Sequence, residues 1–149
     1  MVLYLSKYIA GIYRQSKIEI NQKFQYLGLR ATEGDILLFL HDNPGLSQKK
    51  IAALMVLDPS LVGRDLQRLI EEKYVRRQSS PIDNRVNQVY LTDRGEQIVV
   101  ELQQIIITWW SELLSETENV NEPVISEQLS KLYDAVVKHA LQNRTITDK

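Results

Sequence analysis

Apolar residues recur with a helical period along the first third of the chain. They predict a long first helix over residues 2–27, on the stripe Leu5, Ile9, Ile12, Tyr13, Ile20 and Phe24. We expect a second helix to start at Thr32, because its hydroxyl can cap the free amides of a first helical turn. This helix stops before Asn43-Pro44-Gly45, a sequence typical of a turn.

Two short helical segments follow, with a break at Val56-Leu57 between them. The first has Ser47 as its cap and extends for about two turns. The second starts at Asp58-Pro59, because a carboxylate caps the helix and proline loses nothing at the first helical position. Its apolar side is Val62, Leu66, Leu69 and Ile70, and its other side is Ser60, Gly63, Arg64, Gln67 and Arg68. The second short helix therefore keeps a polar, partly cationic face.

After Lys73 the helical period gives way to a loose alternation. Residues 74–78 and 86–91 are rich in strand-favouring types, and a turn-forming segment, 79–84, separates them. They predict a β-hairpin. Thr92 then caps a long helix to about residue 117, and Pro123 opens a last helix to about residue 142.

The order of these elements predicts a mainly α fold with a small β-hairpin wing. Two short helices, the second polar on one face, followed by a basic hairpin are typical of a winged helix-turn-helix, in which one helix enters the major groove of DNA. We expect a DNA-binding region over residues 29–95. The N- and C-terminal helices, residues 1–28 and 96–149, form the expected dimerisation region.

The net charge of −1 conceals an uneven distribution of charge along the chain. Between Ser47 and Gly95 there are nine basic and six acidic residues, whereas residues 96–149 hold four basic and nine acidic ones. Binding to phosphates requires local positive charge, so the middle of the chain is the segment expected to contact DNA.

Composition argues against several other functions. There is no cysteine, which excludes disulfides and thiolate chemistry, and no glycine-rich phosphate loop or set of nucleophile and base is recognisable. We expect no enzyme activity, no cofactor and no metal, although a metal-sensing regulator remains an alternative for His41 and His139. The chain lacks the pattern of a signal peptide and of a membrane helix, which predicts a cytoplasmic protein.

Four stretches carry a resemblance to a known family: 46–52, 58–69, Asp83-Asn84-Arg85 and Leu91-Thr92-Asp93-Arg94-Gly95. In order and spacing they resemble the MarR family of winged helix-turn-helix transcriptional regulators. The Asp-x-Arg wing followed by Leu-Thr-x-x-Gly is the most specific piece. This sequence departs from the family pattern at Gly63, where threonine is common, and at Tyr74, where glycine is usual.

The resemblance implies roles for particular residues. Arg85 becomes the wing-tip arginine that enters the minor groove, and Asp83 the carboxylate that orients it. The full set expected at the DNA is Gln48, Lys49, Ser60, Leu61, Gly63, Arg64, Arg68, Arg76, Arg77, Asp83 and Arg85. The resemblance also implies small, often phenolic or anionic, effectors bound between the DNA-binding lobe and the dimer helices.

Simpler interpretations of these residues stay open. Arg64 and Arg68 can form a solvated helix face, with Arg68 paired to Glu71 or Glu72. Asp83 and Arg85 can be only a turn ion pair. The neighbours Arg76 and Arg77 point to opposite faces of a strand, so only one of them can meet phosphate. Lys49 and Lys50 are phosphate candidates, but exposed lysines are common everywhere.

The predicted function is that of a sequence-specific regulator of transcription, a repressor that binds double-stranded DNA. A two-fold homodimer sets two recognition helices about 34 Å apart, which requires an operator with an inverted repeat. The alternative is a winged-helix module that binds another protein and no DNA.

Overall fold

The computed structural model describes residues 1–147, which form six helices and three short strands. Their order is α1 (Val2–Tyr26), α2 (Ala31–Asp42), β1 (Leu46–Ser47), α3 (Gln48–Met55), α4 (Pro59–Glu71), β2 (Val75–Ser79), β3 (Asn87–Leu91), α5 (Asp93–Ser115) and α6 (Glu122–Thr147). The mainly α fold class with a β-hairpin is confirmed.

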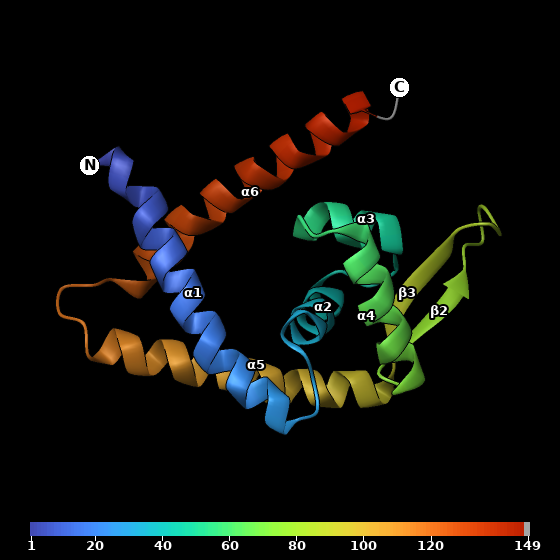
Figure 1. Cartoon of the computed structure of the whole chain (residues 1–149), viewed down its shortest axis with the longest axis horizontal. Helices are drawn as coiled ribbons and strands as arrows, with labels where there is room; N and C mark the ends of the chain where they lie inside the picture. The colour runs from blue at the N-terminus through green and yellow to red at the C-terminus, as the bar shows by residue number, and fades with distance from the viewer. Residues whose placement is uncertain (148–149) are drawn as a thin grey trace.

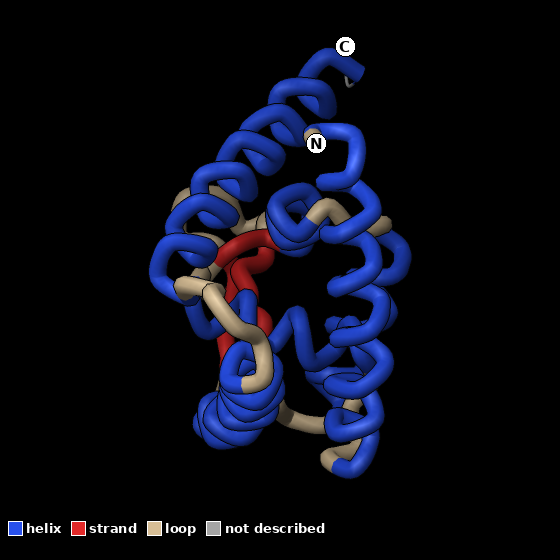
Figure 2. Tube along the Cα trace, turned by 90° about the vertical axis from the view of Figure 1, so that its left-hand side faces the viewer, coloured by secondary structure: helices blue, strands red, loops and turns tan. Residues whose placement is uncertain are grey.

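The elements divide between a compact lobe and three long helices. Helices α2, α3 and α4 lie together with the sheet on one side of the molecule, and the β2–β3 hairpin projects outward from them (Figure 1). Helices α1 and α5 cross beneath this lobe, and α6 runs from the end of α5 towards α3. In the view turned by 90° the strands lie behind the long helices, because the hairpin projects away from the viewer (Figure 2).

Local capping places three of the helices where the sequence predicts them. The Ser47 hydroxyl accepts a hydrogen bond from the Lys50 amide at 3.3 Å, and the Asp58 carboxylate accepts from Ser60 and Leu61 at 2.9 and 3.1 Å. The Thr92 hydroxyl accepts from Gly95 at 3.1 Å. These bonds satisfy amides that have no partner within their own helix, so α3, α4 and α5 start at the predicted caps.

Thr32 does not cap α2, contrary to the prediction. The helix starts at Ala31 with Arg30 as its flanking residue, and the Glu33 carboxylate reaches back to the Arg30 amide at 2.8 Å. The Thr32 hydroxyl instead donates a hydrogen bond to Asp65 in α4. The Glu33 carboxylate caps the start of the helix, and this leaves the Thr32 hydroxyl available for a tertiary contact.

Strand β1 was not expected from the sequence. Leu46 and Ser47 pair with Val89 and Gln88 of β3, which gives an antiparallel sheet in the order β1-β3-β2. Two residues are too few to show the alternation by which strands are recognised. The last helix also begins one residue earlier than expected, at Glu122, and the Asn121 side chain accepts from the Val124 amide at 3.1 Å.

The core of the lobe draws on helices from both ends of the chain. Its fully buried side chains include Phe24, Ile36, Leu37, Leu40, Ile51, Leu66, Leu69, Val89, Val99 and Leu102. Phe24 of α1 packs directly on Gly34 of α2, where an added Cβ would lie 2.4 Å from the ring. The end of α1 and the first half of α5 are therefore fixed to the lobe through one continuous core.

A tight backbone junction joins α4, the hairpin and α5. Lys73 has a φ of 62°, so it is Lys73, not Tyr74, that occupies the left-handed position favouring glycine. Tyr74 is buried, with the Arg94 guanidinium 4.6 Å above its ring. The Tyr74 carbonyl accepts from the Thr92 amide at 3.0 Å and would lie 2.1 Å from a Cβ on Gly95.

Gly95→Ala is expected to destabilise the protein by about 2 kcal/mol, because backbone atoms on both sides must move to admit a methyl group. Gly11→Ala is the matched control, since nothing lies within 4 Å of a Cβ added there in α1. We expect that substitution to leave stability equal or raise it by up to about 1 kcal/mol. Urea unfolding followed by circular dichroism measures both, and equal stabilities for the two variants would contradict the junction described above.

Candidate nucleic-acid interface

The exposed face of α4 presents the residues at its start and middle. Ser60 and Arg64 are exposed, while Val62, Leu66 and Leu69 on the opposite side are buried in the core. Leu61 is half-buried. Because one helix face has to fill the core, the polar face is fixed outward, and this is the arrangement that the periodicity of residues 59–71 predicts.

Gln48, Gly63 and Arg77 come together from three different elements. The Arg77 Nη2 atom donates to the Gln48 Oε1 atom at 3.0 Å. The Gln48 Nε2 atom lies 2.9 Å from where a Cβ on Gly63 would be. The absence of a side chain at Gly63 therefore makes room for Gln48 between α3 and α4. The structure groups these three predicted DNA contacts into one polar cluster.

Arg76 and Arg77 lie on opposite faces of the hairpin, as predicted. Their partners across the strand pair are Tyr90 and Val89. The Arg76 guanidinium stacks over the Tyr90 ring at 4.6 Å and donates to Gln78 at 3.0 Å. Only Arg77 reaches the α3–α4 side of the wing.

The wing tip is ordered by short-range hydrogen bonds. The Ser80 amide donates to the Val86 carbonyl at 2.8 Å, and the Val86 amide donates to the Asp83 carbonyl at 2.9 Å. The Asp83 carboxylate accepts from both the amide and the Nε atom of Arg85, at 3.0 and 3.3 Å.

Arg85 extends into solvent from this turn. Its side chain is 91% exposed. An exposed ion pair contributes at most about 1 kcal/mol to stability, so stability alone does not explain the arrangement. The pair does hold the guanidinium at the outer end of the hairpin.

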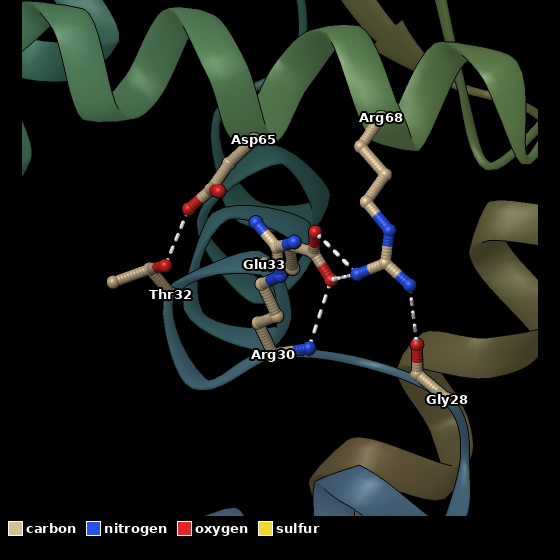
Figure 3. A network of polar contacts seen from close by, with 6 residues as sticks. All are labelled: Gly28, Arg30, Thr32, Glu33, Asp65 and Arg68. Atoms are coloured by element: carbon tan, nitrogen blue, oxygen red, sulfur yellow. Dashed lines mark hydrogen bonds and ion pairs between the residues drawn. The ribbon is translucent and has the colours of Figure 1, made fainter.

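Arg68 lies apart from the other predicted contacts. Its Nη1 atom donates to both carboxylate oxygens of Glu33, at 2.8 and 2.7 Å, and its Nη2 atom donates to the Gly28 carbonyl at 3.2 Å (Figure 3). The hydrogen bonds and the charge of Glu33 raise the pKa of Arg68 above its ordinary value. The partner is thus neither Glu71 nor Glu72, and Glu71 accepts from Gln67 at 3.1 Å.

No local pattern reveals the contacts of Arg68. Glu33 lies 35 residues earlier in the chain, and the helical spacing suggested only partners within α4. A glutamate three residues after a helix start is a capping signal, but it gives no indication of a partner on another helix.

Lys49 and Lys50 lie exposed on α3, near the start of the helix-turn-helix.

A groove between α1 and α5 lies outside this interface. It has a volume of about 480 Å³ and is lined by Gly11, Ile12, Gln15, Glu19, Trp109, Glu112, Leu113 and Glu116. The Trp109 indole donates to Glu19 at 2.6 Å, and this bond and one from Gln15 lower the pKa of Glu19. Three carboxylates give the groove an acidic lining.

Membrane-spanning helices and metal sites are both absent from residues 1–147. No helix in this part of the chain combines the length and the apolar character needed to cross a membrane. Across the same residues, no three His, Asp or Glu side chains gather in an arrangement that could hold a metal ion.

Two short helices, a three-stranded sheet and a projecting hairpin define the chain as a winged helix-turn-helix protein. The profile of the MarR family matches residues 27–85. The regulator SarZ of Staphylococcus epidermidis is 29% identical over 142 residues, covering 91% of this chain and 95% of SarZ. Over residues 27–85 this chain therefore matches the MarR family of transcriptional regulators, which confirms the resemblance inferred from the motifs.

Solved structures show the same architecture. A MarR transcriptional regulator from Methanosarcina mazei superposes with a TM-score of 0.81 at 25% identity, covering 91% of this chain and 97% of that one. The regulator BldR from Sulfolobus solfataricus superposes with a TM-score of 0.78 at 28% identity, covering 89% and 94%. The similarity extends over the long helices as well as the lobe.

Gly63→Ala is expected to raise the thermal midpoint, because alanine in a helix interior is favoured over glycine by up to about 1 kcal/mol. The added Cβ collides only with the flexible end of Gln48, which can move aside. We expect the Gln48 side-chain amide resonances to shift strongly in a ¹⁵N correlation spectrum. A stable variant whose Gln48 amide signals stay in place would contradict the packing of Gln48 over Gly63.

Proposed function

We propose that this protein is a repressor that binds an inverted-repeat operator in double-stranded DNA as a homodimer. The observation that carries the proposal is the joint exposure of two cationic elements, the face of α4 with Arg64 and the wing tip with Arg85. An α-helix fits the major groove, and arginine is attracted to a narrow minor groove. The match to a family of transcriptional regulators supports the same conclusion.

The contacts can be divided by the chemistry that each element offers. Arg64 and Ser60 on α4 are placed to meet base edges, and Arg77 with Gln48 is placed beside them to meet a phosphate or a base. The remaining proposed contacts are Lys49, Leu61, Gly63, Asp83 and Arg85, whereas Arg76 is left out because its guanidinium stacks over Tyr90 on the other face of the hairpin. We leave Arg68 out of the set, because its guanidinium is already engaged with Glu33 and Gly28.

The long helices support the homodimer. Exposed large apolar residues on α1 and α6 include Val2, Leu3, Leu5, Tyr8, Ile9, Ile12, Val124, Ile125, Leu129, Leu132, Tyr133 and Val136. A monomer in water rarely exposes contiguous apolar surface of this extent. A second copy that packs its own α1 and α6 against these helices covers both stripes at once.

Release by a small molecule is part of the proposal, with the α1–α5 groove as its site. The groove adjoins the dimer helices, and its volume falls in the usual range for ligand pockets. Its acidic lining disfavours the anionic effectors that the family resemblance suggested.

As a regulator of genes in a prokaryotic cell, the protein would act in the cytoplasm.

Arg85→Ala and Arg64→Ala are each expected to weaken binding to an operator selected from a random DNA pool by about tenfold or more. Arg85→Ala should also reduce the slope of log affinity against log salt by about one, because one phosphate-region cation is lost. Fluorescence anisotropy at several salt concentrations measures both quantities.

Lys23→Ala is the control for these variants, because it removes one exposed cation from α1. Its affinity should equal that of the unchanged protein. If the unchanged protein shows no salt-dependent binding to any duplex, the proposed DNA binding fails, and the alternative of a winged-helix module that binds another protein takes its place.

Leu132→Glu is expected to convert the dimer to a monomer, because it places a charge in the apolar stripe of α6. Gln97→Glu adds the same charge to the exposed side of α5 and should leave the dimer intact. Analytical ultracentrifugation distinguishes the two masses. An unchanged protein that sediments as a monomer would remove the homodimer from the proposal.

A further inference from the structure

Two polar links join the first turn of α2 to the middle of α4 (Figure 3). In the first, the Glu33 carboxylate accepts two hydrogen bonds from Arg68 and one from the Arg30 amide. In the second, the Thr32 hydroxyl donates to the Asp65 carboxylate. Glu33 and Asp65 are each only 1% exposed, so both carboxylates are shielded from water, whereas the Arg68 side chain is 36% exposed.

Arg68 also connects α4 to the end of α1. Its second guanidinium nitrogen donates to the carbonyl of Gly28, two residues beyond the last residue of α1. Gly28 has a φ of 76°, which glycine adopts without strain. One planar side chain therefore spans α4, the start of α2 and the corner that follows α1.

These links restrict the relative orientation of α2 and α4 more than they stabilise the fold. A buried ion pair contributes little net stability compared with apolar residues of the same volume, because both charges lose their hydration. A bidentate arginine and carboxylate pair does restrict the relative orientation of the two groups. Asp65 and Arg68 are three residues apart on α4, so the two links act on one face of the helix and resist rotation about its axis.

We propose that Arg68 and Glu33 are positioning residues that set the orientation of α4 relative to α1. This inference rests on the proposed function, in which α1 pairs with a second copy and α4 reads DNA. In such a dimer, a rotation of α4 against α1 changes the distance between the two recognition helices. The Arg68–Glu33 link thereby determines which half-site spacing the dimer accepts.

The test measures spacing preference, which a merely structural role would not alter. The operator selected by the unchanged protein is compared with duplexes in which the half-sites are moved closer or farther by one and two base pairs. Arg68→Lys keeps the charge but loses the fork that holds both Glu33 oxygens and Gly28. Glu33→Gln keeps the shape but loses the charge.

Glu96→Gln is the matched control. Glu96 on α5 contacts His41 of α2 at 2.7 Å, so this change breaks a different link between α2 and a neighbouring helix without touching α4. The unchanged protein and Glu96→Gln should prefer the selected spacing by about tenfold or more over a one-base-pair shift. Arg68→Lys and Glu33→Gln should reduce that preference to about threefold or less, with the salt dependence of binding unchanged.

The outcomes separate the inference from the function on which it rests. If the unchanged protein selects no operator, the proposed function fails. If folded, dimeric Arg68→Lys and Glu33→Gln keep the spacing preference of the unchanged protein, the positioning role is overturned while DNA binding stands. If both variants fail to fold, Glu33→Asp takes their place, because it keeps the charge but shortens the side chain that reaches Arg68, and an unaltered spacing preference there also overturns the inference.

Discussion

The structure depends on one constraint, which is that a single face of α4 has to complete the core of the lobe. Val62, Leu66 and Leu69 are buried among side chains from α2, α3 and the sheet. Burial of these three positions fixes the direction in which the opposite side of the helix faces. The exposure of Ser60 and Arg64 therefore follows from packing, and the cationic surface proposed to meet DNA is a consequence of the core.

The same core ties the reading elements to the long helices. Phe24 of α1 and Leu102 of α5 are buried in it, so the lobe cannot swing freely on the helices that would pair two copies. The junction at Tyr74 and Gly95 fixes the wing to the start of α5 in turn. Helix α4, the wing and the long helices α1 and α5 thus form one mechanical unit, and the α1–α5 groove opens within it.

Local signals in the sequence predicted most of the fold and part of the site. The caps at Ser47, Asp58 and Thr92 lie next to the amides they satisfy, so their effect is visible from neighbouring residues alone. The turn that holds Arg85 was predicted in the same way, because it spans a few residues, whereas the role of Arg85 came from the family resemblance and stays a prediction. The prediction for Thr32 was wrong because Glu33 competes for the same helix start.

Contacts between distant residues explain what the sequence did not reveal. The partner of Arg68 is 35 residues away, and the hydroxyl of Thr32 bonds a residue 33 positions later. Strand β1 forms because the free edge of β3 can pair with it. The clearance that Gly63 gives to Gln48 also depends on how two helices meet. None of these contacts has a periodicity from which it could be predicted.

The most direct test of the account is a pair of footprints of the protein on its selected operator, with dimethyl sulfate to probe guanine N7 in the major groove and hydroxyl radicals to probe the sugars from the minor groove. The account predicts two protected major-groove segments about ten base pairs apart, related by a dyad, each flanked outside by protection of the minor groove where a wing tip lies. A single protected segment without symmetry, or protection that does not extend to the flanking minor grooves, would contradict it.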